Sequence, residues 1–164
     1  MSTLQFLTNA IYAIVSGCVN TPATKLDYLH TKALRATLDD LGFETYIAVG
    51  SYLGNLEPSI LVILKSADQL SVVLDCARFY QQKQVFFANQ GVFTAPYLDK
   101  NAESYSATNA ILTGAEAMSQ DSFTEVASLP EGSIIFSVPD LYRNERNFYE
   151  SQTKNAVRRE MHVA

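Results

Sequence analysis

The sequence predicts an α+β domain in which short strands alternate with two helices. Runs of β-branched and aromatic residues indicate the strands, and two segments with apolar residues at helical spacing indicate the helices. Hydrophobic residues make up 48% of the 164 residues, which suits one compact core. We therefore expect a single domain over residues 1–164, with a core at about 10–138 and a C-terminal helix or tail at 139–164.

The first half of the chain predicts three strands and one helix. Residues 10–19 are rich in β-branched and aromatic types and indicate a mostly buried strand. A helix follows, ended by Gly42, because apolar residues recur at helical spacing at Leu26, Ala33, Leu34, Leu38 and Leu41. Residues 44–52 indicate an alternating strand, and residues 57–64 a central strand that is apolar on both faces.

The next segments complete a repeated strand and helix order. Ser66 to Gln69 has the S-x-x-Q form of a capping box before a second helix that we expect to end near Gln81. Residues 84–88 and 92–98 indicate two strands joined by a hairpin turn. The order β-α-β-β-α-β is that of a ferredoxin-like sandwich, which is the predicted architecture.

The C-terminal part adds strands to that sandwich. Residues 99–122 are small and polar and predict an extended hairpin or an ordered loop. Residues 122–126 and 133–138 indicate two extra strands around a Pro-Glu-Gly turn. Residues from 140 onward are charged and predict a terminal helix or a frayed tail.

Composition excludes several classes of function. The longest apolar run has six residues, far below the ~20 that cross a bilayer, so we expect no membrane span. The net charge of −5 argues against a general electrostatic grip on nucleic acid. His30 and His162 are too few and too far apart for a zinc site. Two cysteines without disulfide-scaffold spacing, and no signal-peptide pattern, predict a cytoplasmic protein.

Glu57 is the acidic residue whose context most favours a functional role. It precedes a proline, which biases it toward extended geometry at the start of a strand. Gly50 and Gly54 allow close approach, and Tyr52 supplies an aromatic ring, so the group suits a small cationic or hydroxyl-bearing ligand. The alternative is a solvated glutamate in a turn, paired with a surface lysine.

Two weaker candidates lie near the end of the first strand. Ser16 and Gly17 can present a hydroxyl and backbone N–H groups where the sheet opens into a loop, although a plain turn is an equal alternative. Cys18 and His30 form a conceivable thiolate pair, but two structural residues are the favoured interpretation.

The order of these motifs resembles the small phage-encoded S-adenosylmethionine (SAM) lyases, long described as SAM hydrolases. The resemblance is scattered but collinear over residues 10–138. Its motifs are Val15-Ser16, Leu34-Arg35 with Leu38, the stretch from Gly50 to Glu57-x-Ser59, Ala77, Gln82-x-x-Val85 and Phe123-x-Glu125-Val126. The resemblance implies conversion of SAM to methylthioadenosine and homoserine lactone without a metal or cofactor. It also implies a homotrimer with active sites between subunits.

The resemblance assigns roles to particular residues. Glu57 would hold the cationic part or the amino group of SAM, with Tyr46 as its aromatic partner. Ser16 and Gly17 would lie near the methionine or ribose part, Tyr52 beside the substrate, and Gln82 would support the site. In a phage, the activity would lower SAM for host methylation and restriction in the host cytoplasm.

Two alternatives to the enzyme remain open. A non-catalytic oligomeric module would sequester a nucleotide-like ligand or block a host protein through its acidic surface. A purely structural interaction protein would depend on the tail from Asp140 rather than on Glu57.

Overall fold

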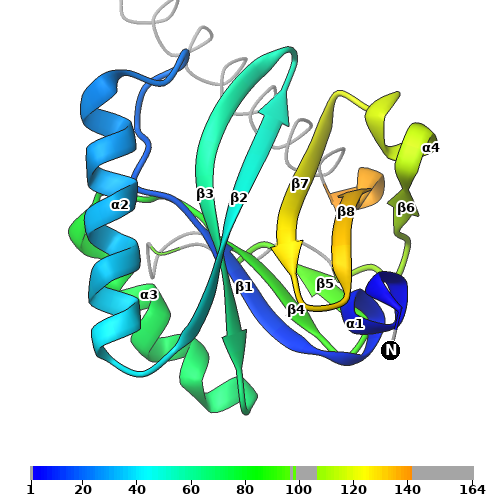
Figure 1. Cartoon of the computed structure of the whole chain (residues 1–164), viewed down its shortest axis with the longest axis horizontal. Coiled ribbons are helices and arrows are strands. Elements are labelled where there is room, and N and C mark those ends of the chain that lie inside the picture. The colour runs from blue at the N-terminus through cyan, green and yellow to red at the C-terminus, as the bar shows by residue number, and fades with distance from the viewer. Residues whose placement is uncertain (1, 97, 99–106, 142–164) are drawn as a thin grey trace, which may run out of the picture.

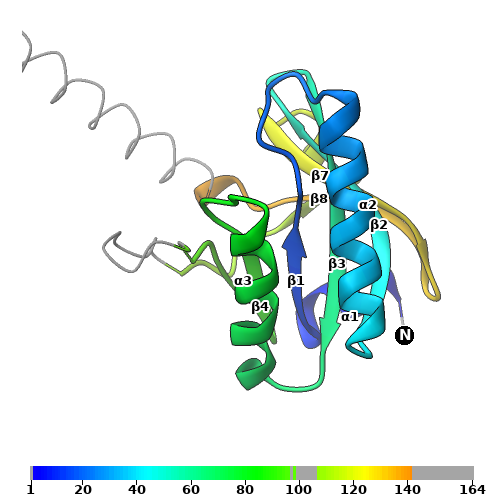
Figure 2. The same ribbon diagram turned by 90° about the vertical axis from the view of Figure 1, so that its left-hand side faces the viewer.

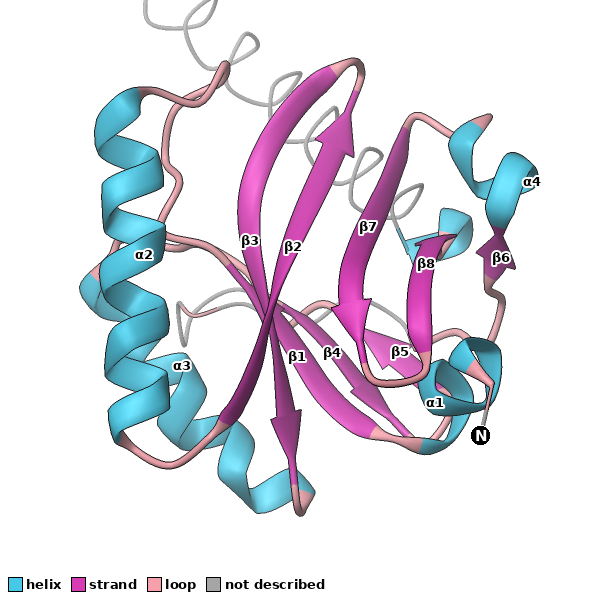
Figure 3. Ribbon diagram, viewed as in Figure 1, coloured by secondary structure: helices cyan, strands magenta, loops and turns pink. Residues whose placement is uncertain are grey.

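The structure is a computed structural model that describes residues 2–96, 98 and 107–141. Strands dominate the fold, with short helices at its edges and two longer helices on one side (Figures 1 and 3). The elements in chain order are α1 (Thr3–Asn9), β1 (Ile11–Val15), α2 (Lys25–Asp40), β2 (Glu44–Tyr52), β3 (Asn55–Leu64), a 3₁₀ turn η1 (Ala67–Gln69), α3 (Leu70–Phe79), β4 (Phe86–Asn89), β5 (Val92–Thr94), β6 (Leu112–Thr113), α4 (Gly114–Met118), β7 (Ser122–Leu129) and β8 (Gly132–Ser137).

These strands form one antiparallel sheet in the order β5-β4-β1-β3-β2-β7-β8-β6. Five strand spacings separate β4 from β8, which would be roughly 24 Å in a flat sheet. The ring centroids of Phe86 on β4 and Phe136 on β8 are nevertheless only 6.1 Å apart. The sheet is therefore curled, and we call the face that carries these two rings the inner face.

Helices α2 and α3 lie on the opposite, outer face of the sheet (Figure 2). Leu34 and Leu38 of α2 and Val73 of α3 are fully buried in one apolar cluster with Ile60 and Val62 of β3. The helix α2 begins at a capping box in which Thr24 and Asp27 satisfy each other's backbone N–H groups. Because these apolar residues recur at helical spacing, burial of one stripe fixes each helix on the sheet.

The inner face encloses a second core that rests on aromatic side chains. Tyr12, Phe86, Phe93 and Phe136 are buried there, and neighbouring ring centroids lie 5.7–6.1 Å apart. Phe6 and Leu7 of α1 join this cluster, so the N-terminal helix covers the inner face near β8. Aromatic pairs at these distances add favourable contact beyond the area that they bury.

The ferredoxin-like sandwich predicted from the sequence is wrong. The order of elements from β1 to β4 follows the predicted one, but β7, β8 and β6 extend the same sheet beyond β2. The extended sheet curls into a half-barrel whose inner face is itself a core, instead of a two-layer sandwich with one open face. The sequence pattern can predict how many strands a segment forms, but it cannot predict to which edge of the sheet those strands are added.

Several element boundaries also differ from the prediction. The first strand ends at Val15, four residues before the predicted end at residue 19, and residues 3–9 form an unpredicted helix. In the region predicted as a hairpin or loop, residues 107–121 contain β6 and α4. Residues 99–106 and nearly all of the predicted C-terminal helix or tail lie outside the described residues. Within the described ranges, no helix is both long and apolar enough to cross a membrane.

Candidate functional site

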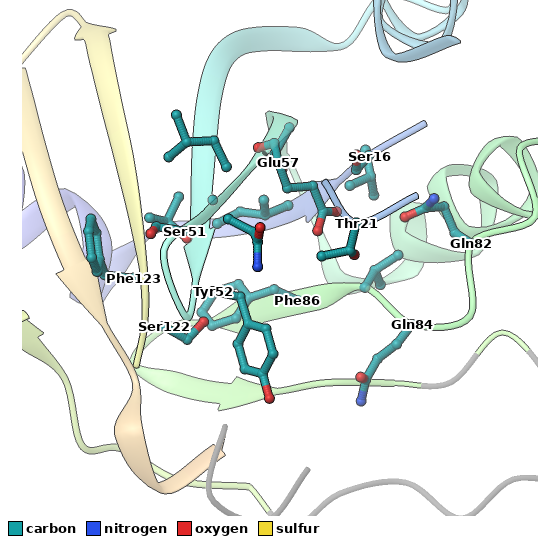
Figure 4. A pocket seen from close by; sticks show the side chains of 18 of the residues that line it. Ser16, Thr21, Ser51, Tyr52, Glu57, Gln82, Gln84, Phe86, Ser122 and Phe123 are labelled. Carbon is teal, nitrogen blue, oxygen red and sulfur yellow. Dashed lines mark hydrogen bonds between the residues drawn. The ribbon is translucent and has the colours of Figure 1, made fainter. Parts of the chain in front are cut away.

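A cavity of about 350 Å³ opens on the inner face of the sheet (Figure 4). Its walls come from β1, β2, β3, β4 and β7, from the loop after β1, and from the segment between α3 and β4. The volume falls within the range of pockets that bind small molecules in proteins.

The cavity exists because the inner-face residues of four neighbouring strands change from apolar to small or polar types at adjacent positions across the sheet. On the inner face, Ile14 of β1 is followed by Ser16, Leu61 of β3 by Ser59 and Glu57, Ala48 of β2 by Gly50, and Val126 of β7 by Thr124. Residues two apart on a strand share a face, so each change occurs on the same side of the sheet. The apolar core therefore stops where the cavity begins.

Two cross-strand rows form the floor of the cavity. Glu57 pairs with Gly50, which also pairs with Thr124. In the next row, Tyr52 pairs with Asn55 on one side and with Ser122 on the other. A Cβ atom placed on Gly50 would lie 3.8 Å from the Cβ of Glu57, so the missing side chain leaves space beside the carboxylate.

Glu57 is the only charged side chain among the described residues that line the cavity. Its carboxylate points toward the side of the cavity where Ser16 and Thr21 lie (Figure 4). The protein atoms packed around it raise its pKa above the ordinary value of 4.5, the neighbouring Ser16 side chain opposes that shift, and the charge of Asp27 adds to it. The residue stays open to solvent, so a ligand can reach the carboxylate.

Ser16 and Gln82 fix the loop that follows β1. The hydroxyl of Ser16 donates to the carbonyl oxygen of Pro58 at 2.5 Å and accepts from the N–H of Cys18 at 3.0 Å. The side-chain amide of Gln82 donates to the carbonyl oxygen of Cys18 at 2.9 Å. Both side chains also line the cavity, so they shape its wall as well as holding it.

The structure brings together most of the residues that the sequence singled out. Glu57, Ser16, Tyr52 and Gln82 line the cavity. Gly17 lies next to Ser16, with its N–H donating to the side-chain oxygen of Thr31 at 3.0 Å.

Tyr46 stands apart from this group. It lies on β2 four residues before Gly50, roughly 13 Å along the strand, and its hydroxyl donates to Glu44. Its pKa is raised to about 12 by that hydrogen bond and by burial. Tyr46 is not among the residues that line the cavity.

The other lining residues had no site role predicted from the sequence. They supply hydroxyl, amide and aromatic groups, and the principal ones are Asn20, Thr21, Gln84, Phe86, Ser122, Phe123 and Thr124. A signal existed for Ser122 and Thr124, which alternate with bulkier residues in a strand otherwise suited to a core. No pattern distinguished the others from ordinary surface and core residues.

The cysteine and histidine pair does not have the features of a nucleophilic site. Burial and the charge of Glu57 raise the pKa of the Cys18 thiol to about 11, whereas an activated thiolate has a lowered pKa. The thiol donates to the carbonyl oxygen of Asn20, and the ring of His30 lies against Tyr80 with centroids 5.6 Å apart. In the described part of the chain, no cluster of three or more metal-ligating side chains occurs.

No protein-family model matches the sequence, and no curated protein matches it either.

Proposed function

We propose that this protein is a SAM lyase that uses the inner-face cavity to bind SAM and release methylthioadenosine and homoserine lactone. The observation that carries the proposal is the position of Glu57, a lone carboxylate in a cavity otherwise lined by neutral groups in the described chain. Such a site attracts a small cation, and SAM carries both a sulfonium and an ammonium group. The resemblance of the sequence to phage SAM lyases supports the same substrate.

The neutral groups of the cavity suit the rest of SAM. Tyr52 and Phe86 offer aromatic surface for a flat, partly apolar ring, and a face of Tyr52 can also attract a cation. Thr21, Ser122 and Thr124 offer hydroxyl groups to a ribose or a carboxylate. The site therefore combines one charged contact with several neutral polar contacts.

The proposed reaction needs little from the protein beyond positioning. An oxygen of the substrate's own carboxylate attacks the γ-carbon that is bound to sulfur. A C–O bond forms, the C–S bond breaks, and its electron pair stays on sulfur, which becomes the neutral thioether of methylthioadenosine. The other product is homoserine lactone, and no proton is transferred. Holding the carboxylate near the γ-carbon makes the step intramolecular, which lowers its entropic cost.

The decisive experiment follows methylthioadenosine release from SAM by purified protein, with a protein-free blank for spontaneous decay. We expect wild-type protein to release the product without added metal. Glu57→Gln should slow release at least about 100-fold, because it removes the charge that holds the cation. Glu116→Gln is the matched control, since Glu116 is exposed on α4 and does not line the cavity. Intact SAM after incubation with wild-type protein would refute the proposal.

A second candidate is a non-catalytic module that retains a nucleotide-like cation. The lining of the cavity favours this candidate, because binding a cation needs only the carboxylate and the neutral groups present there. Calorimetry followed by mass analysis separates the two functions. Tight binding with SAM recovered unchanged supports the module, whereas methylthioadenosine in the cell supports the lyase.

We also propose a homotrimer with sites shared between subunits, acting on host SAM in the cytoplasm. Ile47 and Val49 of β2 and Leu56 of β3 lie on the outer face with 58%, 36% and 57% of their surface exposed. This apolar surface is suitable for burial against another subunit. Tyr46 retains its predicted catalytic role only if assembly brings it to a neighbour's cavity. Sedimentation analysis measures the number of subunits directly.

A further inference from the structure

The loop between β1 and α2, residues 16–24, is held by one buried carboxylate. Asp27 lies in the first turn of α2 and is only 1% exposed. Its carboxylate accepts from the N–H of Thr24 at 2.8 Å and from the N–H of Val19 at 3.0 Å. It also accepts from the hydroxyl of Thr24 at 2.9 Å and from the side-chain amide of Asn20 at 3.1 Å.

Two of these contacts exceed what a helix cap requires. The capping box uses Thr24 and Asp27 alone. The bonds from Val19 and Asn20 span eight and seven residues, respectively, and tie the middle of the loop to the start of the helix. These extra bonds therefore act on the loop, not on the helix.

The loop that Asp27 holds is a wall of the cavity. Asn20 and Thr21 line the cavity together with Ser16 and Glu57. The path of the loop is also restricted at Gly17, where any Cβ atom would lie 2.6 Å from backbone atoms of His30 and Thr31. Gly17 thus packs directly on α2, and Asp27 holds Val19 and Asn20, which follow shortly after it in the loop.

We propose that Asp27 is a positioning residue of the cavity, whose carboxylate holds Asn20 and Thr21 in the wall beside Glu57. This role rests on the proposed function where it concerns SAM, but the placement of the loop does not depend on the reaction. Asp27 acts through its hydrogen-bonded partners and does not line the cavity itself.

Cys18 provides a reporter of the loop that needs no substrate. Its thiol lies within the loop, and burial together with the charges of Glu57 and Asp27 raises its pKa. Cys76 lies on α3 and is the only other cysteine in the chain, so it serves as an internal reference. Releasing the loop and removing the charge of Asp27 should make Cys18 more reactive and leave Cys76 unchanged.

The test compares wild type, Asp27→Asn and Ser2→Ala by iodoacetamide labelling at pH 8, with each cysteine followed by peptide mass spectrometry. Ser2→Ala is the matched control because it removes an equivalent capping box from α1. In Asp27→Asn we expect the labelling rate of Cys18 to rise at least about fivefold, with Cys76 within about twofold of wild type. Both rates should be unchanged in Ser2→Ala. An equal rise at both cysteines, or no rise at Cys18, would overturn the proposal.

The second measurement is the rate of SAM turnover by the same proteins. Asp27→Asn should raise KM about tenfold while kcat changes less than about threefold, because the wall binds substrate and Glu57 is retained. A normal KM in a variant with a reactive Cys18 would also overturn the role. If wild-type protein leaves SAM intact, the proposed function is refuted. The labelling experiment alone then tests whether Asp27 positions the loop.

Asn20→Ala keeps the proposal testable if Asp27→Asn does not fold, because it leaves the helix cap in place. We expect its Cys18 to label at least about twofold faster than in wild type. An unchanged rate would show that Asp27 does not hold the loop through Asn20.

Discussion

The inner face of the sheet has two halves that differ in chemistry although β1, β2, β3 and β7 build both. The apolar half, around Ala48, Leu61 and Val126 with the ring of Phe136 from β8 packed in the same cluster, is buried. The polar half, around Ser16, Gly50, Glu57 and Thr124, leaves a cavity of about 350 Å³. The same strands thus supply stability at one end and an open site at the other.

The difference between the halves indicates which residues the fold itself requires. Aromatic rings of the apolar half add burial and contact, which favour the folded state. Glu57 in the polar half has a raised pKa, so its surroundings disfavour the ionised form. A carboxylate placed where the fold gains nothing from its charge is typical of a functional site.

The largest expected effect comes from the apolar half. Phe136→Ala should lower the free energy of unfolding by about 3–5 kcal/mol, because it leaves a void among packed aromatic rings. Urea denaturation followed by circular dichroism measures this change. A loss below about 1 kcal/mol would mean that the two halves do not differ in packing as described.

A smaller effect on stability but a large effect on binding is expected in the polar half. Gly50→Val should weaken SAM binding roughly tenfold or more, because its side chain would occupy the space beside Glu57. Gly50 does not have a positive φ angle, and valine is favoured in strands, so the fold should tolerate the change. Calorimetry gives the affinity, and unaltered binding with a normal melting temperature would place the ligand elsewhere.

The smallest expected effect is a pH-dependent gain in stability. Because the folded-state pKa of Glu57 is raised, the ionised carboxylate destabilises the fold above that pKa and has no such effect once protonated. Glu57→Gln should therefore melt at a slightly higher temperature than wild type at pH 7–8. The difference should shrink as the pH falls toward the ordinary glutamate value of 4.5. Melting curves across this range check the sign, and a variant less stable at pH 7 would contradict it.

Local structure was largely predictable from the sequence, whereas the overall architecture was not. The spacing of Leu34 and Leu38 predicted α2, and the alternation over residues 44–52 predicted β2. The helix α1 was missed because residues 3–9 lack a long apolar stripe, although Ser2 and Gln5 form a capping box. The curled sheet depends on contacts between β4 and β8, which are 50 residues apart in the sequence at Phe86 and Phe136.

The candidate site was predictable only where a residue has unusual local chemistry. Glu57 stood out because a proline follows it, and Ser16 because it ends a strand. Thr124 and Phe123 reach the cavity only because β7 pairs with β2, a pairing that no local pattern specifies. Tyr46 was predicted as the aromatic partner of Glu57, but the register of β2 and β3 places it opposite Leu61.

The double use of Asp27 has a consequence for how this protein can evolve. One carboxylate both starts a helix and tethers a loop, so no single substitution there can alter one property alone. Lineages that drift at this position would have to restore both the start of the helix and the shape of the cavity wall. Changes in the lining of the cavity should therefore arise by exchange at exposed positions such as Asn20 and Thr21, while Asp27 stays fixed.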